Sequence, residues 1–181
     1  SIALMASVLI SALPVPQTDG HNYEFERQVY FELDKFNVDE AKFNNASTLQ
    51  SIFDELDRLR GIGATDIKVH IIASASLEAS EDYNAKLAYN RNHAVQSHLI
   101  TNRAMNGVEI LTEDGIYDWS LLNRLVNTSS CPHKIEVMQL LRLTPDVITD
   151  QERKAKLLAI GGGAAYSFIR DRFFHYMRYA N

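Results

Sequence analysis

The clearest pattern in the chain is a short alternation of apolar and polar residues at 29–33. Every second residue there is apolar, so an extended chain would turn one face to a core and the other to solvent, and we predict a half-buried strand. The same alternation recurs at 67–73 and, over fewer residues, at 108–110. These two stretches predict a second and a third strand.

Apolar residues at helical spacing fill the intervals between the predicted strands. Residues 43–59 carry them on one face, and Gly61 and Gly63 follow as a stop signal. Ser80 is placed to cap a second helix that ends near Asn102. Strands that alternate with helices predict an α/β fold class, namely an α+β two-layer sandwich with a β-α-β-α-β core and right-handed crossovers.

Beyond Thr112 the spacing becomes helical throughout, which predicts additional C-terminal helices packed on one another. Thr149 and Glu152 have the spacing of a capping box at the start of one helix, and the glycines at 161–163 break the chain before the next. The aromatic residues at 166–176 fit buried packing better than a partner surface.

An apolar run at 2–15 precedes the first predicted strand. It is shorter than the roughly 20 residues of a membrane-spanning helix, and no basic residue precedes it. Two interpretations stay open, of which the first is favoured: a buried strand or segment of a preceding domain, and a residual signal or anchor sequence. We expect a chain cut from a longer precursor, with an N-terminal segment at 1–22, a core domain at 23–112, and a helical decoration with the start of a closing strand at 113–181.

Composition narrows the class of protein. Hydrophobic residues make up 46% and charged residues 23% of the 181 residues, which is the balance of an ordinary soluble globular domain rather than of a disordered chain. A net charge of −5 argues against a nucleic-acid partner, because phosphate contacts need a basic face. Cys131 is the one cysteine, so neither an intramolecular disulfide nor a thiolate metal cluster can form, and cysteine usage leaves the compartment open.

The stretch 72–95, I-A-S-A-S-L-E-A-S-E-D-Y-N-A-K-L-A-Y-N-R-N-H-A-V, resembles the signature of the OmpA-like domain family. In that family a strand, a polar turn and a helix carry the pattern G-x-T-D-x-x-G-S-x-x-Y-N-x-x-L-S-x-x-R-A. Ser76 stands where the family usually has Asp, and Ala79 replaces its Gly. The residues at matching positions are Ser80, Tyr83, Asn84, Leu87 and Arg91.

The turn is more similar to a Bacteroides-type outer-membrane variant of the family, whose A-S-P-E-G is matched by A-S-L-E-A at 75–79. In the family a closing strand follows, and we expect that part of the sheet edge either to be absent from this chain or to be supplied by residues 2–10. The resemblance covers about residues 29–180, although His175 stands where the variant has Pro. The variant's E-D-W-x-x-L, D-x-E-x-K-L, G-x-x-Y and F-P-x-L-R segments are similar to residues 117–122, 150–157, 163–166 and 174–178.

The resemblance implies a ligand, the diaminopimelate-containing stem peptide of peptidoglycan, whose carboxylate meets the helix Arg and whose ammonium meets the turn Asp. On this chain Arg91 would hold the carboxylate through its planar fork of donors, aided by Asn84 and by the helix amides after Ser80. Ser76 supplies no anion, and loss of a charge-assisted contact of about 1.5–3 kcal/mol would weaken binding roughly tenfold to a hundredfold. Glu78 is the first substitute anion, and Glu81 in the helix is the second. The predicted ligand-binding residues are Arg91, Asn84, Ser76, Glu78, Ser80 and Leu87.

Some of the predicted ligand-binding residues could instead have a purely structural role. Without the resemblance, the favoured interpretation of Arg91 is a surface ion pair with Glu81 or Asp82 near it on its own helix. With the resemblance, the ligand role is slightly favoured. For Ser80 and Asn84 the alternative is capping and turn formation, which is favoured for Ser80.

The sequence lacks the common catalytic and metal-binding motifs. Its histidines form no H-E-x-x-H pattern, and His93 and His98 are five residues apart, off a common helix face. It has no G-x-S-x-G elbow, and the glycines at 161–163 follow a helix and lack the Lys of a phosphate-binding loop. We therefore predict no enzyme activity, no metal and no cofactor.

Two functional hypotheses follow. The first is a cell-envelope module on the periplasmic face of the outer membrane, which binds the peptidoglycan stem peptide and tethers an outer-membrane or surface assembly. The second is a structural scaffold of a surface, fimbria-like assembly that has lost peptidoglycan binding and contacts partner proteins. In both, the partners are envelope components, with no nucleic acid and no transmembrane span in this chain.

Overall fold

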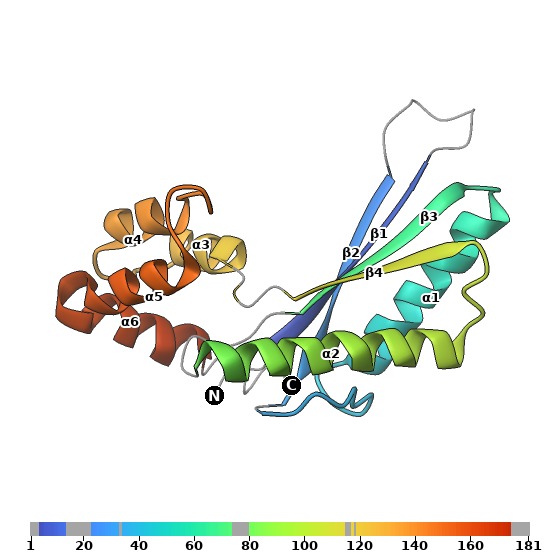
Figure 1. Ribbon diagram of the computed structural model, residues 1–181, viewed down its shortest axis with the longest axis horizontal. Helices are drawn as coiled ribbons and strands as arrows, with labels where there is room; N and C mark the ends of the chain where they lie inside the picture. The colour runs from blue at the N-terminus through green and yellow to red at the C-terminus, as the bar shows by residue number, and fades with distance from the viewer. Residues whose placement is uncertain are drawn as a thin grey trace. The chain divides into compact units, whose positions relative to one another are not determined.

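The chain forms two compact units in the computed structural model (Figure 1). The sheet unit comprises Leu4–Ala75 and Ala79–Ile116, and the helical unit comprises Tyr117–Asn181 with Ser1–Ala3 and Ser76–Glu78. The structure describes residues 4–13, 23–32, 34–73, 80–114, 117 and 119–174.

The sheet unit confirms the predicted fold class. From β2 to β4 its elements follow the predicted β-α-β-α-β order, with one further strand, β1, in front. The strand order is β2-β1-β3-β4; β1 is antiparallel to both of its neighbours, and β3 and β4 are parallel. The elements are β1 (Leu4–Leu13), β2 (Tyr23–Phe31), α1 (Asn45–Gly61), β3 (Thr65–Ala73), α2 (Glu81–Asn102) and β4 (Val108–Asp114).

The N-terminal apolar run contributes β1, which lies between β2 and β3 and not at the sheet edge proposed for residues 2–10. Its alternate residues Ala6, Val8 and Ile10 have no exposed surface. A central position suits them because neighbouring strands on both sides, together with the helices above, remove water from every inward side chain. β1 therefore belongs to the core rather than standing apart from it.

Strand β2 begins at Tyr23, earlier than the predicted 29–33, because it pairs with β1 along nearly its whole length, from Leu4 opposite Phe31 to Ala12 opposite Tyr23. Arg27 interrupts the apolar alternation, which is why the first half of the strand escaped the sequence pattern. Leu33 lies outside the described residues.

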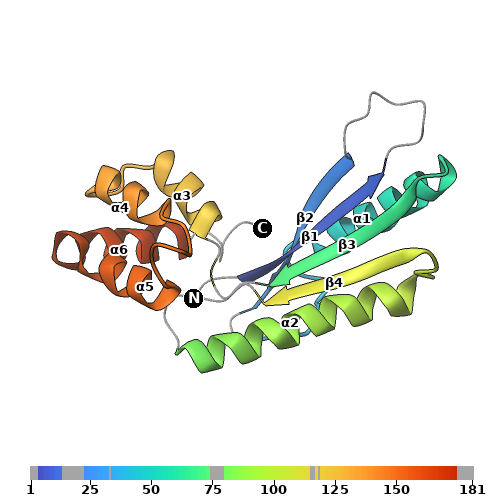
Figure 2. The ribbon, with the colours of Figure 1, turned by 45° about the horizontal axis from the view of Figure 1, so that its top comes forward.

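Helices α1 and α2 pack on one face of the sheet (Figure 2). The inward residues of the strands, among them Ile10 and Ile71, form a single buried cluster with Leu56 of α1 and Val95 of α2. Each buried side chain of this size contributes about 1.5–3 kcal/mol, so this cluster is the main source of stability of the unit.

Helix α1 begins at Asn45 rather than at 43, because Phe43 and Asn44 have left-handed backbone conformations with φ of 54° and 61°. The carboxamide of Asn45, which has no exposed surface, accepts a hydrogen bond from the Tyr30 amide (3.0 Å) and donates to the Tyr30 and Asp39 carbonyl oxygens (2.8 and 3.0 Å). Asn45 thus behaves like a strand residue bound to β2 and fixes where the helix starts.

The helical unit contains the predicted C-terminal helices. The capping box is confirmed: the Thr149 hydroxyl accepts from the Glu152 amide, and the Glu152 carboxylate accepts from the Thr149 amide. The glycines at 161–163 all have positive φ, of 60°, 65° and 96°, which side-chain-bearing residues rarely adopt, and they turn the chain between two helices. The elements are α3 (Trp119–Asn127), α4 (Lys134–Leu141), α5 (Asp150–Ala159), a 3-10 turn (Ile160–Gly163), α6 (Ala164–Ile169) and a π-helical turn (Arg170–Phe174).

The late aromatic residues within the described range, Tyr166, Phe168 and Phe173, are half-buried rather than enclosed. Among the helices that the structure describes, none combines the length and apolar character needed to cross a membrane.

Candidate functional site

Four of the predicted ligand-binding residues are described, and they lie in the cap and the first half of α2: Ser80, Asn84, Leu87 and Arg91. Ser80 caps the helix: its hydroxyl accepts a hydrogen bond from the Tyr83 amide at 3.4 Å, as the structural alternative proposed. Asn84 and Leu87 are buried, with 1% and 6% of their surface exposed. Ser76 and Glu78 lie outside the described residues.

Arg91 is turned into the protein and has no exposed surface. Its Nε donates to the Lys35 carbonyl oxygen at 2.9 Å, and its Nη2 donates to the Glu32 carbonyl oxygen at 3.4 Å. The guanidinium also lies 5.1 Å from the centroid of the Phe31 ring. These contacts leave α2 and reach the end of β2 and the segment that follows it, across more than 50 residues of chain.

The electrostatics of Arg91 reflect this burial. Loss of hydration lowers the pKa of Arg91 to about 10, an effect partly opposed by the nearby Asp34 carboxylate and Tyr83. The guanidinium therefore stays charged at neutral pH. A buried cation of this kind is stabilised by carbonyl dipoles and an aromatic face and is far from the solvated ion pair that the sequence suggested as an alternative.

Tyr83 adds a second link between α2 and the segment after β2. Its hydroxyl donates to Asp34 Oδ1 at 3.0 Å, and this hydrogen bond raises the pKa of Tyr83. Asp34 has a left-handed backbone, with φ of 56°. Asp34 was not predicted as a site residue, because 49 residues separate it from Tyr83 and no spacing rule connects them.

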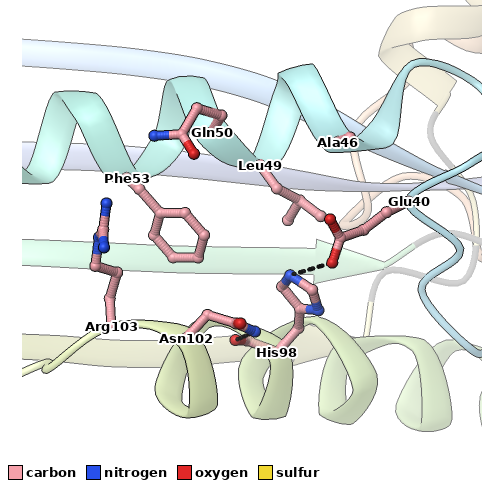
Figure 3. Close-up of a pocket in the computed structure, with 8 residues that line it drawn as sticks. All are labelled: Glu40, Ala46, Leu49, Gln50, Phe53, His98, Asn102 and Arg103. Carbon is pink, nitrogen blue, oxygen red and sulfur yellow. Dashed lines mark hydrogen bonds and ion pairs between the residues drawn. The ribbon is translucent and has the colours of Figure 1, made fainter.

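A cleft of about 190 Å³ lies between α1 and the last turns of α2 (Figure 3). Its floor is formed by Leu49 and Phe53, which are 2% and 7% exposed. Figure 3 shows His98 and Glu40 facing each other, with His98 Nε2 3.6 Å from Glu40 Oε1. The residues that line the cleft are Glu40, Ala46, Leu49, Gln50, Phe53, His98, Asn102 and Arg103.

Charged groups bridge this cleft from α2 to the neighbouring elements. Arg103 Nη2 lies 3.8 Å from Asp57 Oδ2 on α1, and its guanidinium carbon is 5.3 Å from the Phe53 ring centroid. His98 stacks on the same ring with centroids 6.4 Å apart. These contacts hold the two helices together. Among the lining residues no nucleophile is paired with a base, so the cleft does not resemble a reaction site.

Comparisons of the chain with protein-family models, with curated proteins and with solved structures found no match. The resemblance to the OmpA-like family therefore stays a prediction. What the chain does has to follow from the placement of its own side chains.

The helical unit contains a second buried arginine that the sequence did not single out. Arg153 is 3% exposed; its Nη2 donates to the Leu143 carbonyl oxygen at 2.5 Å, and its guanidinium carbon lies 5.2 Å from the Trp119 ring centroid. The Trp119 indole donates to Asp150 Oδ1 at 2.7 Å. Trp119 is thus a buried tryptophan that joins α3 to α5.

Metal and thiol chemistry find little support in the described parts of the chain. Over those residues, no group of three or more His, Cys, Asp or Glu side chains is placed to hold a metal ion. Cys131 is buried, and this burial raises the pKa of its thiol, which keeps the thiol protonated and poorly nucleophilic.

Proposed function

We propose that this protein is a non-catalytic structural module of a cell-envelope assembly, which contacts partner proteins and no longer binds peptidoglycan through α2. This is the second of the two hypotheses raised by the sequence. The observation that carries it is the burial of Arg91, whose guanidinium donates to the carbonyl oxygens of Lys35 and Glu32.

The peptidoglycan hypothesis depends on Arg91 meeting a carboxylate that arrives from solvent. With no exposed surface, the guanidinium can do so only if the segment containing Lys35 moves away. Hydrogen bonds to a charged donor are worth about 1.5–3 kcal/mol each, and a ligand would have to replace them before it gained any affinity. The same side chain is better suited to hold α2 on the end of β2.

The envelope location and the surface-assembly partners rest on the resemblance of residues 72–95 to the OmpA-like family. A family fold can persist when its ligand chemistry is lost, because the fold depends on the core and the ligand on a few site residues. The replacement of the family's Asp by Ser76 supports the same conclusion as the burial of Arg91, namely that the peptidoglycan ligand has been lost.

The test is affinity purification of the tagged full-length protein from the envelope of the organism that produces it, followed by native mass spectrometry. We expect a complex of fixed stoichiometry. A stable monomer with no partner would contradict the proposal. In parallel, the purified chain is sedimented with peptidoglycan sacculi over a range of salt concentrations, and saturable, salt-sensitive retention would restore the peptidoglycan hypothesis in its place.

A further inference from the structure

The face of the sheet opposite α1 and α2 carries no helix of the sheet unit within the described residues (Figure 2). We call it the open face. The strand registers define it: Leu9 of β1 lies opposite Glu26 of β2 and His70 of β3, and His70 lies opposite Leu111 of β4. One row of the open face therefore begins with an acidic side chain at the β2 edge and continues with two apolar side chains on either side of a histidine: Glu26, Leu9, His70 and Leu111.

The next row contributes one further apolar side chain, Ile72. Ile72 lies opposite Ser7 on one side and Glu113 on the other. Together with the first row this places Leu9, Ile72 and Leu111 around His70. Leu111 is 41% exposed, and Leu9 and Ile72 are half-buried, so the centre of the open face is an accessible apolar patch.

Acidic side chains border this patch on both edges of the sheet. On β4, Glu109 lies 3.5 Å from Lys68 Nζ, which neutralises part of the charge of this border, and Glu113 lies 3.2 Å from His70 Nε2. On β2, Glu26 accepts a hydrogen bond from Gln28, and within the described ranges neither Glu24 nor Glu26 forms an ion pair. The β2 border is therefore the more strongly acidic of the two.

The dimensions suit one kind of occupant. Three strand spacings separate β2 from β4, which is roughly 14 Å, and an α-helix with its side chains is about 10–12 Å across. A helix lying along β1 and β3 would place one stripe on Leu9 and Ile72, where the short side chains of Ser7 and Ser11 leave room. Its flanks would face glutamates on both sides.

We infer that the open face docks a basic amphipathic helix of a partner protein, with apolar residues on Leu9, Ile72 and Leu111 and with Lys or Arg directed to Glu24 and Glu26. The inference rests on the proposed function and names the class of partner. A second copy of this chain is a poorer occupant, because its own open face would bring the same glutamates together, and like charges at an interface are repulsive.

The probe is a synthetic helical peptide of Leu and Lys, about 20 residues long, with Leu on one face, which matches the length of β1. Its titration is followed by amide chemical shifts of the isotope-labelled full chain, with a scrambled peptide of equal composition as control. We expect saturable binding, with shifts concentrated in β1 and β3.

The variants separate docking from general charge attraction. The pair Glu24→Lys and Glu26→Lys should weaken binding roughly tenfold, and so should Leu111→Lys, because both remove complementarity on the open face. The matched pair Asp54→Lys on α1 and Asp82→Lys on α2, both exposed, makes the same change in net charge on the helix side of the sheet and should weaken binding less than about twofold. Thermal unfolding of each variant checks that it is folded.

Three results would overturn the inference: no saturable binding, shifts that fall on α1 and α2, or equal weakening by the two charge-reversed pairs. The proposed function is tested separately by the native complex. If that complex persists when Leu111→Lys is introduced into the full-length protein, the open face is not its contact, and the function stands without the inference.

Discussion

The Nε of Arg91 donates a hydrogen bond to the carbonyl oxygen of Lys35, 2.9 Å away, and joins two positions 56 residues apart in the chain. The bond ties the middle of α2 to the segment that follows β2. Since the arginine has no exposed surface, its charge serves the fold of the sheet unit. This relationship is the observation on which the proposed scaffold function rests.

Arg91→Met should lower the free energy of unfolding by about 2–4 kcal/mol, because it leaves the Lys35 and Glu32 carbonyl oxygens without their charged donor. Urea denaturation measures the change. Lys86→Met on the exposed side of the same helix is the matched control and should cost less than about 0.5 kcal/mol. Equal effects of the two substitutions would mean that the buried contacts carry no net stability.

Asn45→Ala should cost about 2–3 kcal/mol, since it removes one acceptor and one donor group that serve the backbone of Tyr30 and Asp39. Asn45→Asp keeps an acceptor for the Tyr30 amide but loses the donors and buries a charge, so it should be at least as damaging. Hydrogen exchange of the Tyr30 amide reports the local effect, and unfolding the global one. An unchanged Tyr30 exchange rate in Asn45→Ala would refute the role of Asn45 as a substitute strand residue.

Arg153→Met should behave differently from Arg91→Met. Arg153 has one hydrogen bond to the Leu143 carbonyl, and its buried Nε has no partner among the residues that the structure describes. Replacing a poorly compensated buried charge with an apolar side chain of similar length is often neutral or stabilising. We expect a change of less than about 1 kcal/mol in the unfolding free energy, and a loss similar to that of Arg91→Met would disprove this distinction.

The capping box of α5 makes stability depend on pH. Hydrogen bonds from the Thr149 amide and hydroxyl lower the pKa of Glu152 below its usual 4.5. The unfolded chain therefore takes up a proton at a higher pH than the folded one, so the stabilisation is present above about pH 4.5 and is lost as the pH falls through the folded pKa. Glu152→Gln should reduce stability at pH 7, and its difference from the wild type should shrink by pH 3 in thermal unfolding. A difference that stays constant with pH would assign the effect to something other than the carboxylate.

Much of the sheet unit could be predicted from local pattern. The alternation that became β3, the helical spacing of α1 and α2, the cap at Ser80 and the box at Thr149 depend on residues within a few positions of one another. Helix and strand periodicity and helix capping involve residues only a few positions apart, so they can be recognised in the sequence alone.

The candidate site could be predicted only in part. The sequence located the start of α2 and the helix arginine. The surface ion pair that it offered as one interpretation of Arg91 is wrong, because the arginine is buried against acceptors that precede it in the chain by α1 and β3. Asp34 and the cleft beside His98 carried no signal, since their neighbours come from remote segments.

Local periodicity was thus sufficient to locate α1, α2, β3, β4 and the end of β2, whereas it left β1 open and missed the first half of β2. The central place of β1, the clamp of Asn45 on Tyr30 and the inward turn of Arg91 emerge only when distant segments pack together. The physical reason is that burial and hydrogen-bond partners depend on all the elements that surround a side chain, whereas helix and strand patterns depend on near neighbours.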